Sequence, residues 1–383
     1  MRARSTSSSG RSSPRRQGVD GGATVGAVSV APETGISVEE LRLAARNHAL
    51  PLEALRWPIT PVGLHYLLIH YDVPLVDPTS WRLELGGAVE QPLSLSLDEL
   101  RARPAVELAA TMECAGNGRA LLEPRPISQP WLTEAVGTGL WRGVELAPLL
   151  AEAVPSPTAV DVVFAGLDRG VEGEVEQVYE RSLSLDDATG AGCVLAYELN
   201  GAPLPPQHGF PLRLVVPGWY GMTNVKWLSE ITVVETPFDG YQVVNGYRFR
   251  QSEDEEGRPV TLMRPRSLMV PPGMPDFMTR ERIVDRGGVE LQGRAWSGRA
   301  PIVRVEVSVD GGGTWADAAL EPDPDHRWAW SGWTFTWDAS AAGSFTLCCR
   351  ATDETGETQP LEPAWNLGGY ENNAVQRVPV VVR

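Results

Sequence analysis

Lysine, cysteine and long apolar runs are scarce in this 383-residue chain, and the last two scarcities each exclude a class of protein. Lysine occurs once, at Lys226, although lysine and arginine together number 33. The four cysteines are too few for a disulfide-stapled scaffold, and they form no C-x-x-C or C-x-x-C-H pattern of a zinc or attached haem site. No apolar run approaches about 18 residues, so the sequence predicts no transmembrane helix.

The charge of the chain is strongly acidic. There are 49 acidic and 33 basic residues, which gives a formal net charge of −16 and a pI near 4.8. Phosphate backbones and anionic lipid repel such a chain, so nucleic acid and membrane surfaces are not expected partners. The low cysteine content favours a reducing compartment, and we expect a cytoplasmic protein.

Residues 1–35 are rich in Ser, Gly and Arg and contain no aromatic residue. This composition predicts a disordered tail. The Arg15-Arg16 pair raises the alternative of a twin-arginine export signal. The apolar segment that follows begins only at Ala23 and is interrupted by glycine and polar residues, so export is not expected.

Two patterns follow one another after the tail. Between residues 36 and 250, short helical segments alternate with short strands, and Gly and Pro are frequent, which predicts an α+β domain. One short helix is expected within residues 38–55. Residues 252–257 are acidic and polar and mark a domain boundary. Residues 258–383 alternate in the manner of strands, which predicts an immunoglobulin-like β-sandwich.

Cys114 lies where a strand-like segment enters the turn Cys114-Ala115-Gly116-Asn117-Gly118-Arg119. Glycines let backbone amides approach the sulfur, and Arg119 favours the thiolate. A thiolate is either a nucleophile or a ligand for a soft metal. A buried, inert cysteine before a turn is the alternative interpretation.

A second group of chemistry-bearing residues lies between positions 205 and 227. His208 and Arg213 flank a Phe210-Pro211 bend, and a glycine-containing loop runs on to Lys226. Side-chain cations and loop amides form an anion site, most naturally for phosphate. The spacing is neither that of a P-loop nor that of a dinucleotide fingerprint, and a solvated loop with incidental charges is the alternative.

These segments, in this order, resemble the sulfite oxidase family of molybdenum enzymes over roughly residues 57–383. The resemblance is carried by Cys114-Ala115-Gly116-Asn117-Gly118-Arg119, Gly137-Thr138-Gly139-Leu140-Trp141-Arg142-Gly143, Gly166-Leu167-Asp168, Ala196-Tyr197-Glu198-Leu199-Asn200, His208-Gly209-Phe210-Pro211-Leu212-Arg213, Val225-Lys226-Trp227-Leu228 and Trp365-Asn366-Leu367-Gly368-Gly369.

The resemblance implies a fold, a cofactor and a set of site residues. The fold is a sulfite-oxidase-type mixed α/β molybdopterin domain, over residues 36–250, followed by an immunoglobulin-like dimerisation domain, over residues 258–383. The cofactor is molybdenum-molybdopterin, with Cys114 as the thiolate ligand of the metal. The residues implied to bind the cofactor are His70, Asp168, His208, Arg213, Asn224, Val225 and Lys226. The residues implied to act in catalysis are Tyr247, Arg119 and Trp131.

The sequence departs from the family in two places that bear on the substrate. The family carries an Arg-Asn-His segment where this chain has Leu68-Ile69-His70, and an arginine where it has Gly368. Arg46 or Arg248 are the candidates to replace the two missing arginines. If neither does, the pocket is less positive and favours a neutral or larger substrate.

The resemblance implies an oxidoreductase that transfers an oxygen atom to or from a small oxyanion or oxo substrate, with sulfite to sulfate as one case. The sequence has no recognisable haem or flavin module, so a separate electron-carrier protein is expected, and the C-terminal domain implies a homodimer. Two alternatives stay open: a hydrolase or transferase that uses Cys114 as nucleophile and His208 as base, and a non-catalytic relative that acts as an interaction protein.

Overall fold

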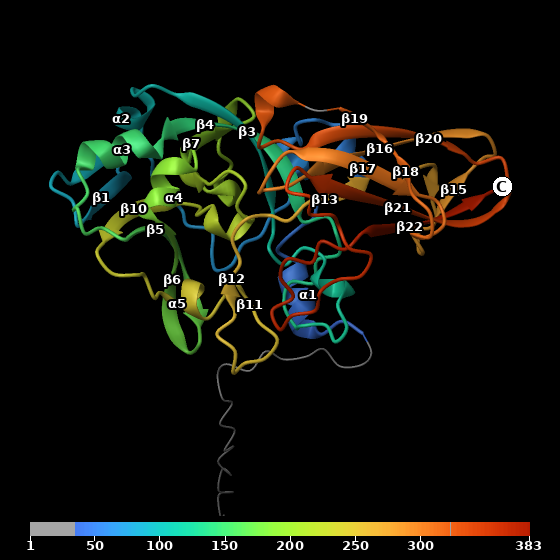
Figure 1. The fold of residues 1–383 in the computed structure, drawn as a ribbon. Helices are drawn as coiled ribbons and strands as arrows, with labels where there is room; N and C mark the ends of the chain where they lie inside the picture. The colour runs from blue at the N-terminus through green and yellow to red at the C-terminus, as the bar shows by residue number, and fades with distance from the viewer. Residues whose placement is uncertain (1–34, 322) are drawn as a thin grey trace, which may run out of the picture.

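The structure is a computed structural model that describes residues 35–321 and 323–383. The tail predicted for residues 1–35, apart from its last residue, and the Arg15-Arg16 pair lie outside the described residues. Within the described part, no helix has the length and apolar character needed to cross a membrane. Figure 1 shows two lobes side by side, a mixed lobe on the left and a β-sandwich on the right.

The mixed lobe is built from short helices and two sheets, as the sequence predicted. Its helical elements are α1 (Val38–Ala44), η1 (Leu52–Arg56), η2 (Val62–Leu64), α2 (Leu97–Arg101), η3 (Arg119–Leu121), α3 (Leu146–Ala153), α4 (Leu185–Gly190), η4 (Pro206–His208), η5 (Gly221–Thr223) and α5 (Tyr241–Val244). Its strands are β1 (Arg82–Gly87), β2 (Leu93–Ser96), β3 (Val106–Glu113), β4 (Val136–Glu145), β5 (Asp161–Glu172), β6 (Val175–Ser184), β7 (Val194–Leu199), β8 (Ala202–Pro203), β9 (Arg213–Val215) and β10 (Leu228–Val234).

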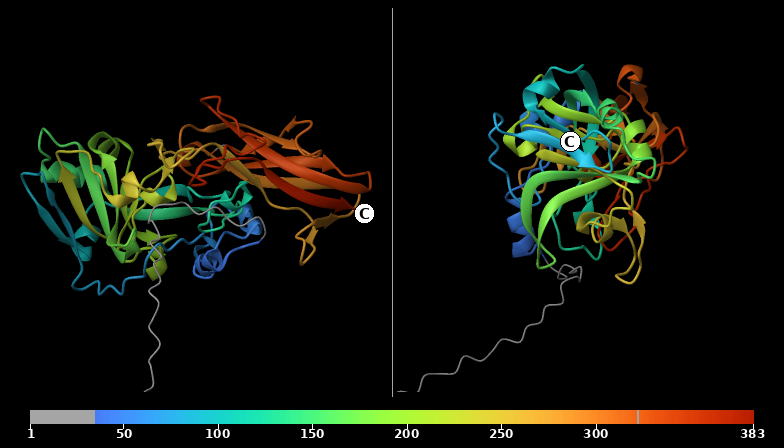
Figure 2. Two further views of the ribbon diagram at one scale, coloured as in Figure 1. Left: turned by 90° about the horizontal axis from the view of Figure 1, so that it is seen from below. Right: turned by 90° about the vertical axis from the view of Figure 1, so that its left-hand side faces the viewer.

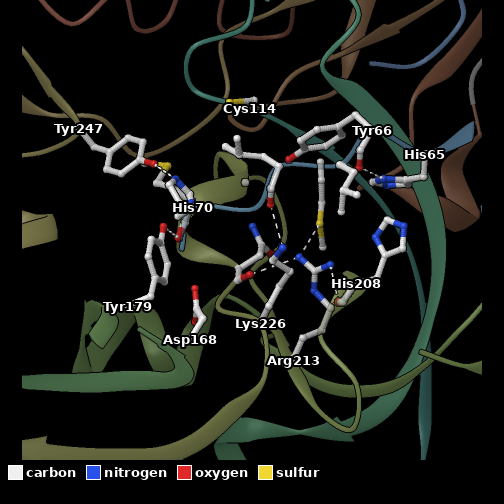
Figure 3. Close-up of a pocket in the computed structure, with 16 residues that line it drawn as sticks. His65, Tyr66, His70, Cys114, Asp168, Tyr179, His208, Arg213, Lys226 and Tyr247 are labelled. Atoms are coloured by element: carbon white, nitrogen blue, oxygen red, sulfur yellow. Dashed lines mark hydrogen bonds between the residues drawn. The ribbon is translucent and has the colours of Figure 1, made fainter. Parts of the chain in front are cut away.

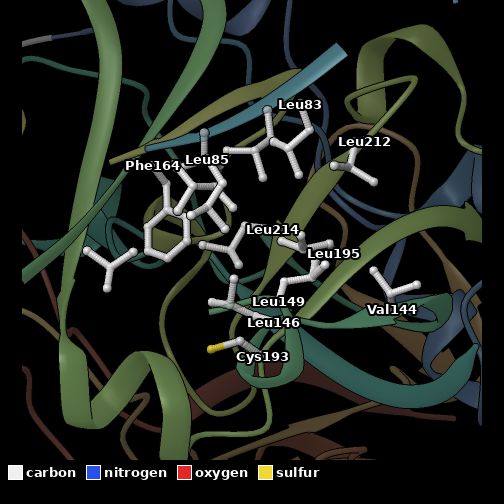
Figure 4. Close-up of a cluster of buried hydrophobic side chains, with 14 of the residues drawn as sticks. Leu83, Leu85, Val144, Leu146, Leu149, Phe164, Cys193, Leu195, Leu212 and Leu214 are labelled. Atoms are coloured by element: carbon white, nitrogen blue, oxygen red, sulfur yellow. The ribbon is translucent and has the colours of Figure 1, made fainter. Parts of the chain in front are cut away.

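The two sheets of this lobe enclose one hydrophobic core. One sheet has the order β2-β1-β10-β5-β6, and the other has the order β3-β4-β7-β8 with β9 paired to β7. Both sheets and helix α3 contribute buried side chains, and burial of each large one contributes about 1.5–3 kcal/mol. Figure 4 shows its central members Leu83, Leu85, Val144, Leu146, Leu149, Phe164, Cys193, Leu195, Leu212 and Leu214.

The second lobe is the predicted β-sandwich. A small hairpin of β11 (Arg248–Phe249) and β12 (Arg258–Pro259) precedes it. Its strands are β13 (Arg266–Met269), β14 (Met274–Pro275), β15 (Arg282–Val284), β16 (Gly288–Trp296), β17 (Ile302–Ser308), β18 (Ala316–Asp317), β19 (Ala319–Glu321), β20 (Ser331–Asp338), β21 (Gly343–Asp353) and β22 (Gln376–Val382), with the short turn η6 (Pro324–His326) before β20. They form the sheets β13-β16-β20-β19 and β14-β15-β22-β21-β17-β18.

The short helix expected within residues 38–55 is α1, which ends at Ala44 and is followed by the turn η1. Between the two elements the side-chain oxygen of Asn47 accepts a hydrogen bond from the N–H of Ile69, at 2.7 Å. This contact ties the segment after α1 to the chain that lines the pocket described below.

The two lobes meet along the end of β3. Figure 2 shows the lobes from below as an elongated pair, with the teal and blue segments of the first lobe lying where the two join. The backbone N–H of Thr111 in β3 donates to the carbonyl of Trp328, and the turn after β3 contacts residues 368–372 near the C-terminus. The segment that carries Cys114 therefore lies at the junction.

Candidate active site

A pocket opens in the mixed lobe, and most of the site residues expected from the sequence line it. Figure 3 shows the side chains of His70, Cys114, Asp168, His208, Arg213, Lys226 and Tyr247 around one space, together with His65, Tyr66 and Tyr179.

Cys114 follows directly after β3 and begins a tight turn. The N–H of Asn117 donates to the carbonyl of Cys114 at 2.9 Å, and the Cys114 residue is 7% exposed. A Cβ at Gly116 would lie 2.7 Å from the guanidinium carbon of Arg119, so only glycine lets Arg119 fold back over the turn. Burial raises the pKa of the Cys114 thiol, while the charge of Arg119 and the Gly116 N–H oppose that shift.

Lys226 and Arg213 supply the cationic part of the pocket. The Lys226 ammonium donates to the carbonyls of Leu68 and Gln207 at 2.8 and 3.2 Å. Burial and the charge of Arg213 lower the pKa of Lys226, whereas the Asp168 carboxylate opposes that shift. Burial also raises the pKa of Asp168. An anion bound between the two cations would favour their charged forms.

Two buried histidines flank Arg213. The rings of His65 and His208 meet edge to face with 5.7 Å between centroids. Burial lowers the pKa of His65 to about 4 and that of His208 to about 2, and the charge of Arg213 adds to both shifts. Both rings are therefore neutral at pH 7 and can hydrogen-bond a ligand without adding charge.

A group of aromatic residues forms another side of the pocket. The Nε2 atom of His70 and the hydroxyl of Tyr247 form a hydrogen bond of 2.6 Å, and His70 stacks on Tyr179 with 4.7 Å between centroids. Burial and then the charges of Lys226 and two arginines lower the pKa of His70 to about 3. Burial raises the pKa of Tyr247 well above 10. Both members of the pair are thus neutral near pH 7.

Arg181 is a charged residue of this region that the sequence analysis did not find. Its guanidinium lies over the Tyr247 ring at 5.3 Å from the centroid, and the residue is 5% exposed. One nitrogen donates to the Gln242 carbonyl, and Nε has no hydrogen-bond partner among the described residues. The signal that could have found it is the alternation of buried and less buried side chains along β6, in which Tyr179, Arg181 and Leu183 all point inward.

Two of the residues expected to act in catalysis lie beside the pocket rather than on its wall. Arg119 donates through Nε to the Gly368 carbonyl at 2.9 Å and lies over the ring of Tyr370, which in turn packs against Tyr247. Trp131 is buried in the same hydrophobic cluster as Cys114 and lines a neighbouring groove.

Of the residues expected to bind the cofactor, Val225 differs from the rest. Its side chain is fully buried in the core between the two sheets, its N–H donates to Thr223, and its carbonyl accepts from Leu214. It has no free backbone group for a ligand. Asn224 does line the pocket, with Oδ1 accepting from the N–H of Val216 at 2.7 Å.

Neither replacement arginine considered in the sequence analysis lines the pocket. Arg248 donates to the side chain and carbonyl of Glu256 and to the Gly257 carbonyl, away from it. Arg46 is exposed and donates to the Tyr71 carbonyl at 2.7 Å. Neither arginine takes the place of Leu68 or Gly368 on the pocket wall, although the charge of Arg46 is near enough to lower the pKa of Lys226.

The pocket fits a phosphorylated pterin cofactor that carries a soft metal. Several buried polar atoms in it have no hydrogen-bond partner among the described residues, namely His65 Nε2, Asp168 Oδ1 and Arg213 Nε. Buried polar atoms are nearly always paired, so these three indicate a missing ligand. Lys226, Arg213 and His208 would hold the phosphate, Asp168 and Asn224 the pterin, and Cys114 the metal. When bound, molybdenum-molybdopterin supplies two-electron redox chemistry.

Comparison with known proteins gives the same result. The family model described as "Oxidoreductase molybdopterin binding domain" matches residues 70–242, and the model described as "Mo-co oxidoreductase dimerisation domain" matches residues 262–383. The sulfane dehydrogenase SoxCD from Paracoccus pantotrophus matches in structure with a TM-score of 0.75 and 25% identity, over 92% of this chain and 91% of that one.

The sequence is also similar to curated enzymes. Mitochondrial sulfite oxidase of Macaca fascicularis is 37% identical over 342 residues, which are 85% of this chain and 62% of that protein, so the chain spans less than two thirds of that relative. Sulfite oxidase of Arabidopsis thaliana is 33% identical over 84% of this chain and 87% of its own length. Nitrate reductase [NADH] 1 of Oryza sativa is 32% identical over 85% of this chain and 38% of its own length. The chain therefore belongs to the sulfite oxidase family of molybdopterin-dependent oxidoreductases.

Proposed function

We propose that the chain oxidises a small oxyanion by adding one oxygen atom, with sulfite as the leading substrate. In that reaction sulfite and water give sulfate, two protons and two electrons. The oxygen atom comes from water, and the two electrons pass to a separate carrier protein. The names of the relatives support this class of reaction, and the charge of the pocket selects among its substrates.

The observation that carries the proposal is a set of cations without carboxylate partners. Lys226 and the three arginines Arg119, Arg181 and Arg213 donate only to backbone carbonyls and to one methionine sulfur. Within residues 35–321 and 323–383, no carboxylate lies within ion-pair distance of any of the four, and the Asp168 carboxylate acts on Lys226 only from farther away. Buried cations without a close carboxylate are costly, so their retention indicates anionic ligands.

The four cations fall into two groups, which matches two anions. Arg213 and Lys226 lie together and suit the cofactor phosphate. Arg181 lies over the Tyr247 ring and Arg119 over the Tyr370 ring, at 5.3 and 5.1 Å from the centroids, and the two rings pack together. Neither arginine lines the pocket, but the charges of both lower the pKa of His70 on its wall, so this second group makes the site more positive and favours a small anion over a neutral substrate.

The hydrogen-bonded pair of Tyr247 and His70 holds a proton beside the substrate. Both are neutral near pH 7, for the reasons given above, so the pair can hold the hydroxyl proton in a short hydrogen bond and orient it beside the substrate. The aromatic rings around it, Tyr179 and Tyr370, limit the access of bulk water.

The alternative of a cysteine nucleophile with a histidine base has less support. Burial raises the pKa of the Cys114 thiol and lowers the pKa of His208 to about 2, the reverse of an activated pair for thiol transfer. A pocket with several orphaned polar atoms likewise argues against a non-catalytic relative.

We further propose a homodimer formed through the sandwich and a cytoplasmic location. The match of residues 262–383 to a dimerisation domain supports the first, and the cysteine content alone supports the second. Light scattering should give a mass near twice 41.5 kDa. A monomer mass at micromolar protein would contradict the dimer.

The test of function is a substrate screen on the molybdenum-loaded enzyme with artificial electron carriers. Sulfite should be oxidised with an oxidised dye, and turnover of nitrate or dimethyl sulfoxide with a reduced dye should be at least tenfold slower. Faster turnover of nitrate would assign the chain to a reductase, and faster turnover of a neutral sulfoxide would show that the second cation group does not select the substrate.

A further inference from the structure

The residue just before Cys114 is a buried carboxylate with three side-chain donors. Glu113 is 2% exposed. Its Oε1 accepts from Asn117 Nδ2 at 2.9 Å and from Arg266 Nη1 at 2.7 Å, and its Oε2 accepts from Trp296 Nε1 at 2.9 Å. Because a carboxylate with this many bonds has one fixed orientation, Glu113 is held rigidly next to the cysteine.

Two of these three donors come from the sandwich. Arg266 begins β13 and Trp296 ends β16, and the two face each other in the register of this antiparallel pair. Arg266 is 1% exposed and also donates to the Asn372 carbonyl at 2.7 Å. The strand pair β13–β16 of the sandwich therefore contacts the end of β3 in the mixed lobe.

The sandwich also holds the turn after Cys114 from its other side. The N–H of Glu371 donates to the Ala115 carbonyl at 2.9 Å, and Asn372 Nδ2 donates to the Gly118 carbonyl at 2.7 Å. Gly118 has φ +88°, and a Cβ there would lie 2.7 Å from Asn372 Nδ2. A side chain at this position would thus be strained and would displace Asn372.

We infer that Arg266 and Trp296 are positioning residues for the Cys114 thiolate and act through Glu113. Buried ion pairs seldom add net stability, so a fully enclosed pair of Glu113 and Arg266 is better explained by the geometry that it fixes. The pair also balances charge next to the sulfur, since Arg266 offsets the negative Glu113. The sandwich then serves the active site directly, in addition to any role in dimerisation.

The inference rests on the assignment of Cys114 as the metal ligand but not on the identity of the substrate. Its test uses the molybdenum-loaded full chain without substrate. The readouts are the reduction potential of the metal from a dye-mediated titration and the paramagnetic resonance spectrum of the half-reduced metal. Neither readout responds to a change that affects only folding stability.

The test compares two variants at the contact with one control variant. Glu113→Gln removes a negative charge and leaves Arg266 in place, so the potential should rise. Trp296→Phe removes one donor to Glu113 and leaves its negative charge less balanced, so the potential should fall. Trp337→Phe is the matched control, because Trp337 is also buried in the sandwich but lies opposite Val289, near the start of β16 and away from the cysteine turn.

The expected result is shifts of opposite sign for Glu113→Gln and Trp296→Phe, an altered spectrum in both, and wild-type values for Trp337→Phe. If Glu113→Gln does not fold, the potential and the spectrum of Trp296→Phe alone still test the inference. Wild-type potential and spectrum in Trp296→Phe would overturn the inference, whatever its melting temperature.

A wild-type chain that binds no molybdenum would overturn the metal-site assignment and the inference together, whereas loaded protein inactive on sulfite would overturn only the proposed substrate.

Discussion

The Nε2 atom of His70 lies 2.6 Å from the hydroxyl oxygen of Tyr247, although the two residues are 177 positions apart in the chain. The contact joins the segment after η2 to the loop after α5, and both residues line the pocket. Tyr247 adopts a left-handed backbone, with φ 53°, which is unusual for a tyrosine. Such a conformation at a pocket is typical of a residue held for function.

Loss of the Tyr247 hydroxyl should slow turnover without loss of the cofactor. We expect Tyr247→Phe to lower kcat about 10- to 100-fold, since the pair with His70 can no longer hold a proton. Molybdenum content should stay at the wild-type value. Steady-state kinetics and metal analysis measure both. Tyr220→Phe is the control, because Tyr220 is buried outside the pocket and loses an equivalent hydroxyl; equal kcat values in the two variants would contradict the role of the pair.

Removal of the only lysine should release the cofactor. We expect Lys226→Met to retain less than about a tenth of the wild-type molybdenum and pterin after gel filtration, because a bound phosphate loses its nearest point charge. Lys226→Arg keeps the charge with a different shape and should retain an intermediate amount. Full cofactor retention by Lys226→Met would show that the phosphate is held elsewhere.

Arg181 should determine the affinity for an anionic substrate. We expect Arg181→Met to raise KM for sulfite about tenfold or more, with a smaller effect on kcat, because a buried guanidinium near the substrate is lost. Inhibition by sulfate should weaken in parallel. Arg169→Met is the matched control on the same β5–β6 hairpin, where Arg169 is exposed and pairs with Glu176. An unchanged KM in Arg181→Met would remove Arg181 from the substrate site.

The buried histidines make the stability of the cofactor-free protein depend on pH. Burial lowers the pKa of His65 to about 4 and that of His208 to about 2, whereas both have values of about 6.5 in the unfolded chain. As pH falls below about 6.5, the unfolded chain takes up protons that the folded protein does not, so stability is lost. Each histidine should cost about 2 kcal/mol at pH 5 relative to pH 7.5.

Urea unfolding at pH 7.5 and pH 5 measures this loss. His65→Gln should reduce the loss by about 2 kcal/mol, because one of the three histidines with a lowered pKa, which include His70, is gone. His326→Gln is the control, since His326 is exposed in the sandwich. If His65→Gln lost as much stability as the wild type between the two pH values, His65 would not be held neutral in the folded protein.

The sequence was sufficient to predict the order of the two lobes and the site residues that lie within motifs. The change from mixed to alternating patterns predicted an α+β lobe before a sandwich, and the turn at Cys114 and the segment from His208 to Lys226 indicated one site. These features are local, so a pattern of neighbouring residues carries them. The pocket then brings their side chains together.

The features that the sequence could not supply depend on long-range packing. Arg181 has no motif, and its place over Tyr247 follows from how β6 and α5 meet. Glu113 and Arg266 are 153 positions apart, and nothing in either segment marks the pair.

The most direct measurement of the central claim is the number of sulfur atoms bound to molybdenum, determined by X-ray absorption at the metal edge. The wild-type chain should show one sulfur more than Cys114→Ser, because the Cys114 thiolate is then replaced by oxygen. The same count in both proteins would show that Cys114 does not bind the metal, and the account of the site would fail.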